Sequence, residues 1–214
     1  MGGSVNDGDV WRHVDHQRAE LADLLETLTS EQWATTSLCE GWTIRDVAAH
    51  LTHANADWTR MAVEALRSGL RFNAMMVRIA RADDRPAEEI VAALRAMVGA
   101  RRKPPGTQVA DPLMDALIHG QDIARPLGIR RCMPTEAALV VADRLWGMRF
   151  PLNPRRRFPG IRFTATDAPF SAGAGRPVAG PLDDLVLVMA GRAAGLAGLT
   201  GDVTALALAR NGQE

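Results

Sequence analysis

The sequence predicts a mainly α-helical protein, in which a four-helix bundle is followed by a small α/β C-terminal domain. Apolar residues recur at spacings of three and four through much of the first 130 residues, as they do along amphipathic helices. After residue 150, short strand-like runs alternate with glycines. We therefore expect a bundle at residues 8–130 and an α/β domain at residues 134–210, with a boundary near residues 129–134.

The helices of the bundle are predicted from this periodicity at residues 10–28, 44–68, 87–99 and 111–125. Residues 29–32 interrupt the pattern and are expected to form a break. Thr43 is the expected N-cap of the second helix, because its hydroxyl can accept the backbone N–H of Asp46. Pro126 and Gly128 are expected to stop the fourth helix.

The C-terminal domain has weaker and shorter signals. Helices are predicted at residues 134–148, 182–194 and 202–209, and strands at residues 161–166 and 169–171. Thr135 is the expected cap of the first of these helices. Residues 173–180 lack the spacing of a phosphate-binding loop, and Pro177 within them favours a hairpin loop.

The composition excludes several classes of function. The chain of 214 residues has 25 basic and 25 acidic side chains, which argues against nucleic acid and membranes as partners. No apolar run reaches the roughly 18 residues that span a bilayer. The two cysteines, Cys39 and Cys132, are too few for a disulfide framework. Residues 1–9 lack the basic and apolar stretches of an export signal, so we expect a cytoplasmic protein.

Three polar side chains on the predicted bundle helices could hold a metal ion. Asp115 and His119 are four residues apart and so share one face of the fourth helix. His50 lies beside the apolar stripe of the second helix, and packing of the two helices would bring all three together. Three protein ligands leave one tetrahedral position open, which is typical of a catalytic zinc site. The spacing alone leaves an alternative to a metal site, in which a histidine of the core is hydrogen-bonded to a carboxylate.

Two stretches of the sequence resemble a known family. Residues 39–51, CEGWTIRDVAAHL, are similar to the signature of the DinB-like metal-binding bundles, and more narrowly to the mycothiol-dependent maleylpyruvate isomerase family. Residues 115–128, DALIHGQDIARPLG, resemble the second ligand helix of that family. A weaker third similarity, in short pieces between residues 165 and 202, is to the small C-terminal domain of the family.

The resemblance implies a divalent metal, most often zinc, held by His50, Asp115 and His119. The family pattern has Glu where this chain has Asp115, so the carboxylate here is one methylene shorter. The implied cofactor besides the metal is mycothiol or a similar low-molecular-weight thiol, whose metal-activated thiolate is the nucleophile. An isomerase or an S-transferase acting on a small electrophilic molecule is therefore expected. The sequence leaves the oligomeric state open, with a homodimer as one option.

Two further side chains are catalytic candidates. Asp122 follows His119 by three residues and could accept the second ring N–H of a ligand histidine, with a surface cap or salt bridge as the alternative. Arg192 matches an arginine position of the family that could hold a substrate carboxylate, with a surface arginine as the alternative. His53 is expected to line the pocket or to act as an alternative ligand, and Cys39 to be an inert thiol.

Other features have simpler interpretations. His13 and His16 are read as surface residues of the first helix, and Trp42 and Trp58 as core or pocket wall. The basic run at residues 155–157 is read as a solvated loop, with an anion clamp as the alternative.

Two other functions remain open at this point. The first is a non-catalytic binding or regulatory module with the DinB-like fold, in which the polar cluster only fixes the helix register. The second is a metal-dependent hydrolase that uses bound water in place of a thiol.

Overall fold

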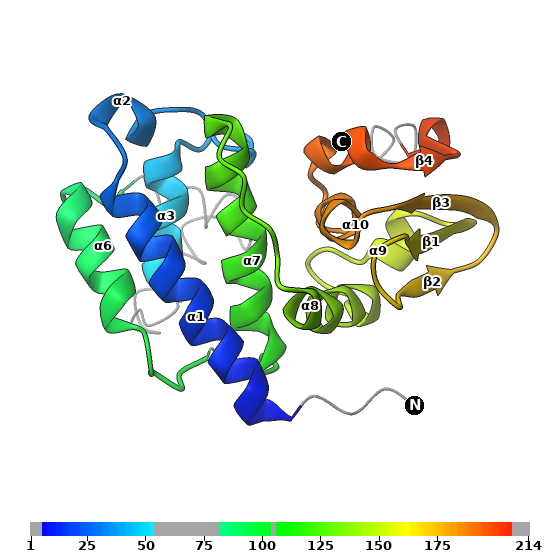
Figure 1. Cartoon of the computed structure of the whole chain (residues 1–214), viewed down its shortest axis with the longest axis horizontal. Helices are drawn as coiled ribbons and strands as arrows, with labels where there is room; N and C mark the ends of the chain where they lie inside the picture. The colour runs from blue at the N-terminus through cyan, green and yellow to red at the C-terminus, as the bar shows by residue number, and fades with distance from the viewer. Residues whose placement is uncertain (1–5, 54–81, 104–105, 207–214) are drawn as a thin grey trace. The chain divides into compact units, whose positions relative to one another are not determined.

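The computed structural model describes residues 6–53, 82–103 and 106–206. The chain divides into two compact units, Met1–Arg131 and Cys132–Glu214, and each is described by itself (Figure 1). The fold class predicted from the sequence, mainly α with a small α/β C-terminal part, is confirmed. Among the described helices, none combines the length and the apolar character needed to cross a lipid bilayer.

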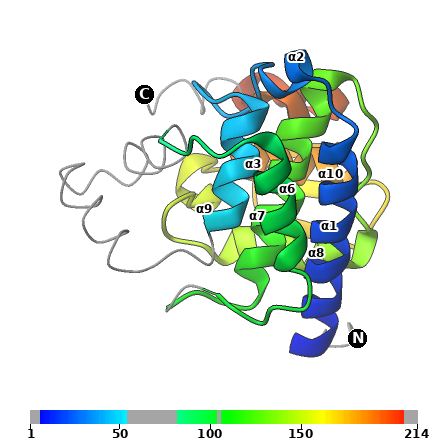
Figure 2. The same ribbon diagram turned by 90° about the vertical axis from the view of Figure 1, so that its left-hand side faces the viewer.

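In its described residues, the N-terminal unit is a bundle of four helices, α1, α3, α6 and α7, with one short helix and one 3-10 turn. The bounds are α1 (Asp7–Glu26), α2 (Ser30–Trp33), α3 (Ile44–Thr52), α6 (Ala87–Ala96), α7 (Ala110–Ala124) and η2 (Arg125–Leu127). Helix α1 packs against α6 and α7, and α3 packs against the same two helices (Figures 1 and 2). As a result, α3 and α7 lie side by side, and these are the two helices that carry the predicted metal ligands.

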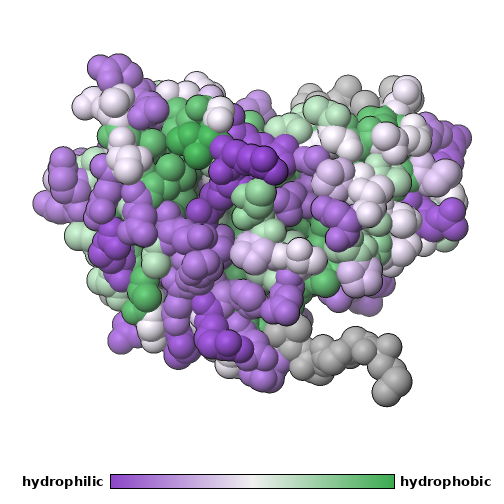
Figure 3. All heavy atoms as spheres, in the orientation of Figure 1, coloured by the Kyte–Doolittle hydropathy of each residue, from purple (hydrophilic) through white to green (hydrophobic). Residues whose placement is uncertain are grey.

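Apolar stripes on the four helices form the core of this unit. The most deeply buried members come from all four helices: Leu21, Leu25, Ile44, Val47, Ile90, Leu94, Leu113 and Leu117. Burying each side chain of this size stabilises the fold by about 1.5–3 kcal/mol. The opposite face of α1 is mostly hydrophilic (Figure 3), so the helix is amphipathic, as its sequence periodicity predicts.

The helix ends show where the sequence prediction was right and where it was wrong. The Thr43 side chain accepts the Asp46 backbone N–H, as predicted, and the Asp46 carboxylate accepts the Thr43 N–H in return. Residues 29–32, predicted as a break, instead begin helix α2, because Thr29 and Gln32 form the same reciprocal capping box. The predicted continuation of α3 over residues 54–68 lies outside the described residues, and α6 ends at Ala96, three residues earlier than expected.

The C-terminal unit is a small mixed sheet with helices packed on it. Its elements are α8 (Thr135–Gly147), α9 (Pro154–Arg157), β1 (Ile161–Ala165), β2 (Ser171–Gly173), β3 (Arg176–Gly180), α10 (Leu182–Met189), η3 (Ala193–Gly198) and β4 (Thr200–Gly201). The strand order is β2-β1-β3-β4, with β1 and β3 parallel and the other two pairs antiparallel. Helix α10 packs against α8, β1 and β3, and Phe163, Val178 and Leu185 are fully buried in this unit.

Several predictions for this unit were wrong in detail. The second strand begins at Ser171, and strands β3 and β4 were missed. Pro177 belongs to β3, and β2 and β3 do not form a hairpin, because β1 lies between them. The backbone at Gly175 lies close to the backbone at Gly160, just before β1. A Cβ on Gly175 would lie 2.3 Å from the Gly160 carbonyl oxygen, so this position requires glycine.

The predicted helix ends of this unit also need correction. Pro134 is the N-cap of α8 and Thr135 is its first residue, with no side-chain cap hydrogen bond. Helix α10 ends at Met189, five residues before the predicted end. Residues 203–206 are helical, and the rest of the helix predicted at residues 202–209 lies outside the described residues.

Candidate metal centre

The structure brings the three predicted ligands together between α3 and α7. Asp115 Oδ1 lies 3.6 Å from His50 Nε2 and 3.3 Å from His119 Nε2. The three potential ligand atoms are all within 4.8 Å of one another. The two imidazole rings are nearly perpendicular, with an interplanar angle of 78°. Two separate parts of the sequence thus present two ring nitrogens and one carboxylate oxygen to a common point.

The two separations from Asp115 Oδ1 fit a tetrahedral metal ion. Metal–ligand bonds of about 2.0–2.2 Å at tetrahedral angles separate the ligand atoms by about 3.3–3.6 Å. The two separations measured to Asp115 Oδ1, 3.3 and 3.6 Å, agree with this range. The aspartate is therefore long enough to reach the same point as both imidazoles, although the family pattern has glutamate there. Three ligands leave a fourth tetrahedral position for an exogenous group.

The electrostatics of the cluster favour a cation. Burial raises the pKa of Asp115, but hydrogen bonds with His119 and His50 outweigh burial and leave that pKa below its ordinary value. Burial lowers the pKa of His119, but its hydrogen bonds with Asp115 and Asp122 outweigh burial and raise that pKa well above 6.5. The cluster therefore holds an ionised carboxylate against two imidazoles, an arrangement that attracts either a proton or a metal ion.

Asp122 orients the His119 ring. Its carboxylate is fully buried, and Oδ2 lies 2.8 Å from His119 Nδ1. When Nδ1 donates its proton to this carboxylate, Nε2 faces Asp115, where it can donate a second proton or, once that proton is lost, bind a metal ion. The sequence prediction that Asp122 accepts the second ring N–H of His119 agrees with this contact, whereas the alternative of a surface residue does not.

Cys39 also contacts this pair, which the sequence reasoning missed. Its Sγ donates to Asp122 Oδ2 at 3.0 Å and lies 3.7 Å from His119 Nδ1. The thiol was expected to be inert because no histidine is near it in the sequence, but the fold brings it beside a histidine 80 residues away. The available signal was its place at the start of the 39–51 motif.

Trp42 forms one wall of the cluster. Its ring is stacked on His119 with an interplanar angle of 12°, and it meets the His50 ring edge-on with centroids 5.2 Å apart. The side chain is buried, in agreement with its expected role as core or pocket wall. Trp58 lies outside the described residues.

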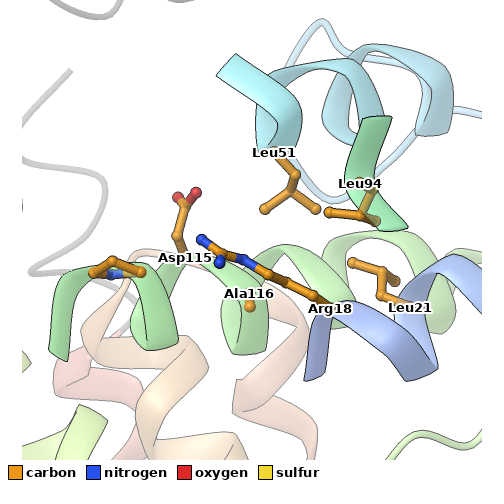
Figure 4. A pocket seen from close by; sticks show the side chains of 7 residues that line it. Arg18, Leu21, Leu51, Leu94, Asp115 and Ala116 are labelled. Carbon is orange, nitrogen blue, oxygen red and sulfur yellow. The ribbon is translucent and has the colours of Figure 1, made fainter. Parts of the chain in front are cut away.

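A pocket adjoins the cluster inside the bundle (Figure 4). Its walls are mainly apolar, and the lining residues are Arg18, Leu21, Leu51, Leu94, Pro112, Asp115 and Ala116. The guanidinium of Arg18 extends from α1 toward Asp115 (Figure 4), and Arg18 Nη1 donates to the Met97 carbonyl at 2.9 Å. Burial lowers the pKa of Arg18. A buried positive charge therefore lies next to the carboxylate that faces the two histidines.

His53 belongs to a different cluster. Its Nε2 lies 2.9 Å from Asp83 Oδ2, and neither residue is in the metal-binding groups found among the described residues. The structure thus does not place His53 as an alternative ligand. Arg85 hydrogen-bonds the Asp83 carboxylate and holds the pKa of that carboxyl below its ordinary value.

The His53 environment predicts a pH-dependent loss of stability. Burial lowers the pKa of His53 below 6.5, so the folded state binds its proton less readily than the unfolded state does. The stability present above pH 6.5 should therefore decline as the pH falls below that value. In thermal unfolding, the decrease in Tm between about pH 7 and pH 5 should be smaller in His53→Gln than in wild type, whereas His16→Gln should keep the wild-type decrease. Equal decreases in wild type and His53→Gln would contradict this interpretation.

The remaining candidates lie at other places in the two units. His16 is an exposed residue of α1 whose Nε2 lies 3.2 Å from Glu20 Oε1. Arg155 lies in α9, over the Trp146 ring. Arg192 lies in the C-terminal unit between α10 and η3, and its Nη1 donates to the Ala190 carbonyl at 2.8 Å. Its role toward a substrate carboxylate stays a prediction.

Comparisons with known proteins show which family and which fold the chain resembles. Residues 14–111 match the family model described as the mycothiol maleylpyruvate isomerase N-terminal domain. A crystal structure of the mycothiol-dependent maleylpyruvate isomerase is similar, with a TM-score of 0.58 and 15% identity over 92% of this chain and 93% of that chain. The structure of a histidine-to-alanine mutant of this isomerase matches with a TM-score of 0.56 at the same identity and coverage.

No curated protein matches the chain. The solved isomerases establish its fold over most of its length, and the family model confirms the resemblance predicted from the sequence. Residues 14–111 therefore match the mycothiol maleylpyruvate isomerase N-terminal domain family, within a chain that has the fold of these isomerases.

Proposed function

We propose that this chain is a metal-dependent enzyme that uses a low-molecular-weight thiol, such as mycothiol, to isomerise or conjugate a small electrophile. The observation that supports this most directly is that His50 Nε2 and His119 Nε2 lie 3.6 and 3.3 Å from Asp115 Oδ1, with one ligand atom of each residue within 4.8 Å of the others. The family of residues 14–111 and the fold of the chain support the same activity.

The proposed ligands are His50, Asp115 and His119, and the proposed metal is zinc. Two imidazoles and one carboxylate form a ligand set that zinc accepts, with one position left open. Because a single carboxylate neutralises one of two metal charges, the centre would keep a net positive charge that favours an anionic fourth ligand. A bound divalent ion would deprotonate a coordinated thiol and so supply a nucleophile at neutral pH.

The other residues of the cluster would control geometry and water. Asp122 would keep the His119 ring in the orientation that presents Nε2, through the 2.8 Å hydrogen bond to Nδ1. Trp42 would cover both imidazoles with an apolar surface and thereby limit the access of water. Arg192 would bind a substrate carboxylate, as its match to an arginine position of the family implies. Isomerisation and S-transfer need the same activated sulfur, so the ligand residues do not separate the two reactions.

Metal reconstitution in the presence and absence of a thiol tests this proposal. The protein is stripped with a chelator, reloaded with zinc, and assayed with mycothiol and a panel of small electrophiles. We expect turnover only when both zinc and thiol are present. Ester or amide cleavage without thiol would point to a hydrolase instead, and bound zinc with no thiol turnover on any electrophile would point to a non-catalytic module.

A further inference from the structure

The turn that precedes α3 is attached to α7 at Asp122 by two hydrogen bonds. The Leu38 N–H donates to the Asp122 carbonyl at 3.2 Å, and Cys39 Sγ donates to Asp122 Oδ2 at 3.0 Å. Ser37 holds the turn itself, because its Oγ accepts the Cys39 N–H at 3.1 Å and donates to the Trp42 carbonyl at 2.9 Å. The thiol is therefore presented to Asp122 by a backbone that has its own fixed hydrogen bonds.

Two donors meet at the same buried oxygen of Asp122. His119 Nδ1 lies 2.8 Å from Oδ2, and Cys39 Sγ lies 3.0 Å from it. These separations are shorter than the roughly 3.3 Å or more between ligands of one tetrahedral metal ion. Cys39, His119 and Asp122 are therefore read as a hydrogen-bonded group, although their atoms are close enough together to suggest a second metal site.

We propose that Cys39 is a positioning residue for His119, acting through Asp122. This inference rests on the proposed function, because it concerns how strongly His119 binds the metal there. The S–H group donates one of the hydrogen bonds that the buried Asp122 Oδ2 accepts. This bond fixes the direction in which the carboxylate faces the imidazole. Asp122 in turn fixes the ring that presents Nε2 toward Asp115.

The physical reason is the cost of a buried carboxylate. Asp122 has no exposed surface, so each donor to its oxygens replaces a water molecule that the folded protein excludes. If the thiol donor is removed, the carboxylate is less constrained in rotation. The His119 hydrogen bond should then weaken, and the ring should be held in a different orientation. Both effects change how Nε2 meets a metal ion.

Three variants separate the donor from the volume of the thiol. Cys39→Val keeps an apolar side chain of similar size but has no donor, whereas Cys39→Ser keeps a donor. Cys132→Val, at an exposed cysteine of the C-terminal unit, is the matched control. Zinc affinity is measured by competition with a chelator, and the absorption spectrum of the cobalt-substituted protein is recorded. We expect about 10-fold weaker zinc binding and an altered cobalt spectrum for Cys39→Val, at the lower end of the effect of losing an outer partner of a ligand.

The serine variant decides whether the donor is responsible. Cys39→Ser and Cys132→Val should bind zinc within about threefold of wild type, well below the 10–100-fold losses typical of outer-partner removal. Wild-type affinity in Cys39→Val would overturn the proposal. Equal weakening in Cys39→Val and Cys39→Ser would also overturn it, because packing alone would then explain the effect.

Nuclear magnetic resonance of the metal-free protein provides a readout that does not depend on the proposed function. The His119 Nδ1 proton reports on its hydrogen bond to Asp122. We expect its resonance to move upfield in Cys39→Val, as the hydrogen bond weakens, and to stay near the wild-type position in Cys39→Ser. An unchanged resonance in Cys39→Val would overturn the positioning role. If wild type binds no metal but this resonance shifts as expected, the proposed function fails while the positioning of the ring is upheld.

Discussion

Replacement of His119 by alanine is expected to abolish stoichiometric metal binding and thiol-dependent turnover. The variant loses one of three ligand atoms, and Asp115 also loses the imidazole that lies 3.3 Å from it. Removing an outer partner of a ligand typically weakens metal binding 10–100-fold, so removing the ligand itself should exceed about 100-fold. Metal content after dialysis, measured by atomic emission, and turnover of the zinc-reloaded protein check this expectation.

His16→Ala is the matched control for this prediction. His16 is an exposed histidine of α1, and its partner in the structure is Glu20. The control should retain the wild-type metal content and turnover. Unchanged zinc loading in His119→Ala, or an equal loss in His16→Ala, would show that the metal is held elsewhere or that its binding is non-specific.

Replacement of Asp122 by asparagine is expected to weaken zinc binding by about 10–100-fold. The amide has nearly the same shape as the carboxylate but no charge, so it accepts the His119 Nδ1–H more weakly. The hydrogen bond with Asp122 that helps raise the pKa of His119 is therefore weakened. The ring should therefore be a poorer ligand, although its contacts with Trp42 remain. Chelator competition measures the affinity, and thermal unfolding monitors the fold.

Asp143→Asn serves as the control, because Asp143 is an exposed acidic residue of α8 in the other unit. It should bind zinc as wild type does. Wild-type affinity in Asp122→Asn would mean that the carboxylate does not support the His119 ligand, even though the two side chains are in contact.

The bundle could be predicted from the sequence because the signals for its helices, apolar spacing and a capping residue, lie within short stretches of the chain. Apolar spacing located α1, α3, α6 and α7, and Thr43 located the beginning of α3 correctly. The i,i+4 spacing of Asp115 and His119 is a property of one helix, so their shared face followed directly. The approach of His50 required only that the second and fourth helices pack together, which is common in a four-helix bundle.

The parts that were missed depend on contacts between distant residues. Strands β3 and β4 are short, and β3 is defined by its pairing with β1 and β4 and not by any periodicity of its own. Cys39 lies 83 residues before Asp122, and a turn in the sequence does not reveal which helix its side chain will contact. The role of Cys39 therefore became visible only when the fold placed its thiol beside the buried carboxylate.

X-ray absorption at the zinc edge, with and without an added thiol, tests the proposed centre most directly. Without thiol, the account predicts nitrogen and oxygen ligands at about 2.0–2.2 Å, as expected for His50, Asp115 and His119. On addition of mycothiol, one sulfur should appear at about 2.3 Å. A sulfur ligand in the thiol-free protein would show that a cysteine of the chain binds the metal and would contradict the proposed ligand set. The absence of sulfur after thiol addition would contradict a thiol-binding centre.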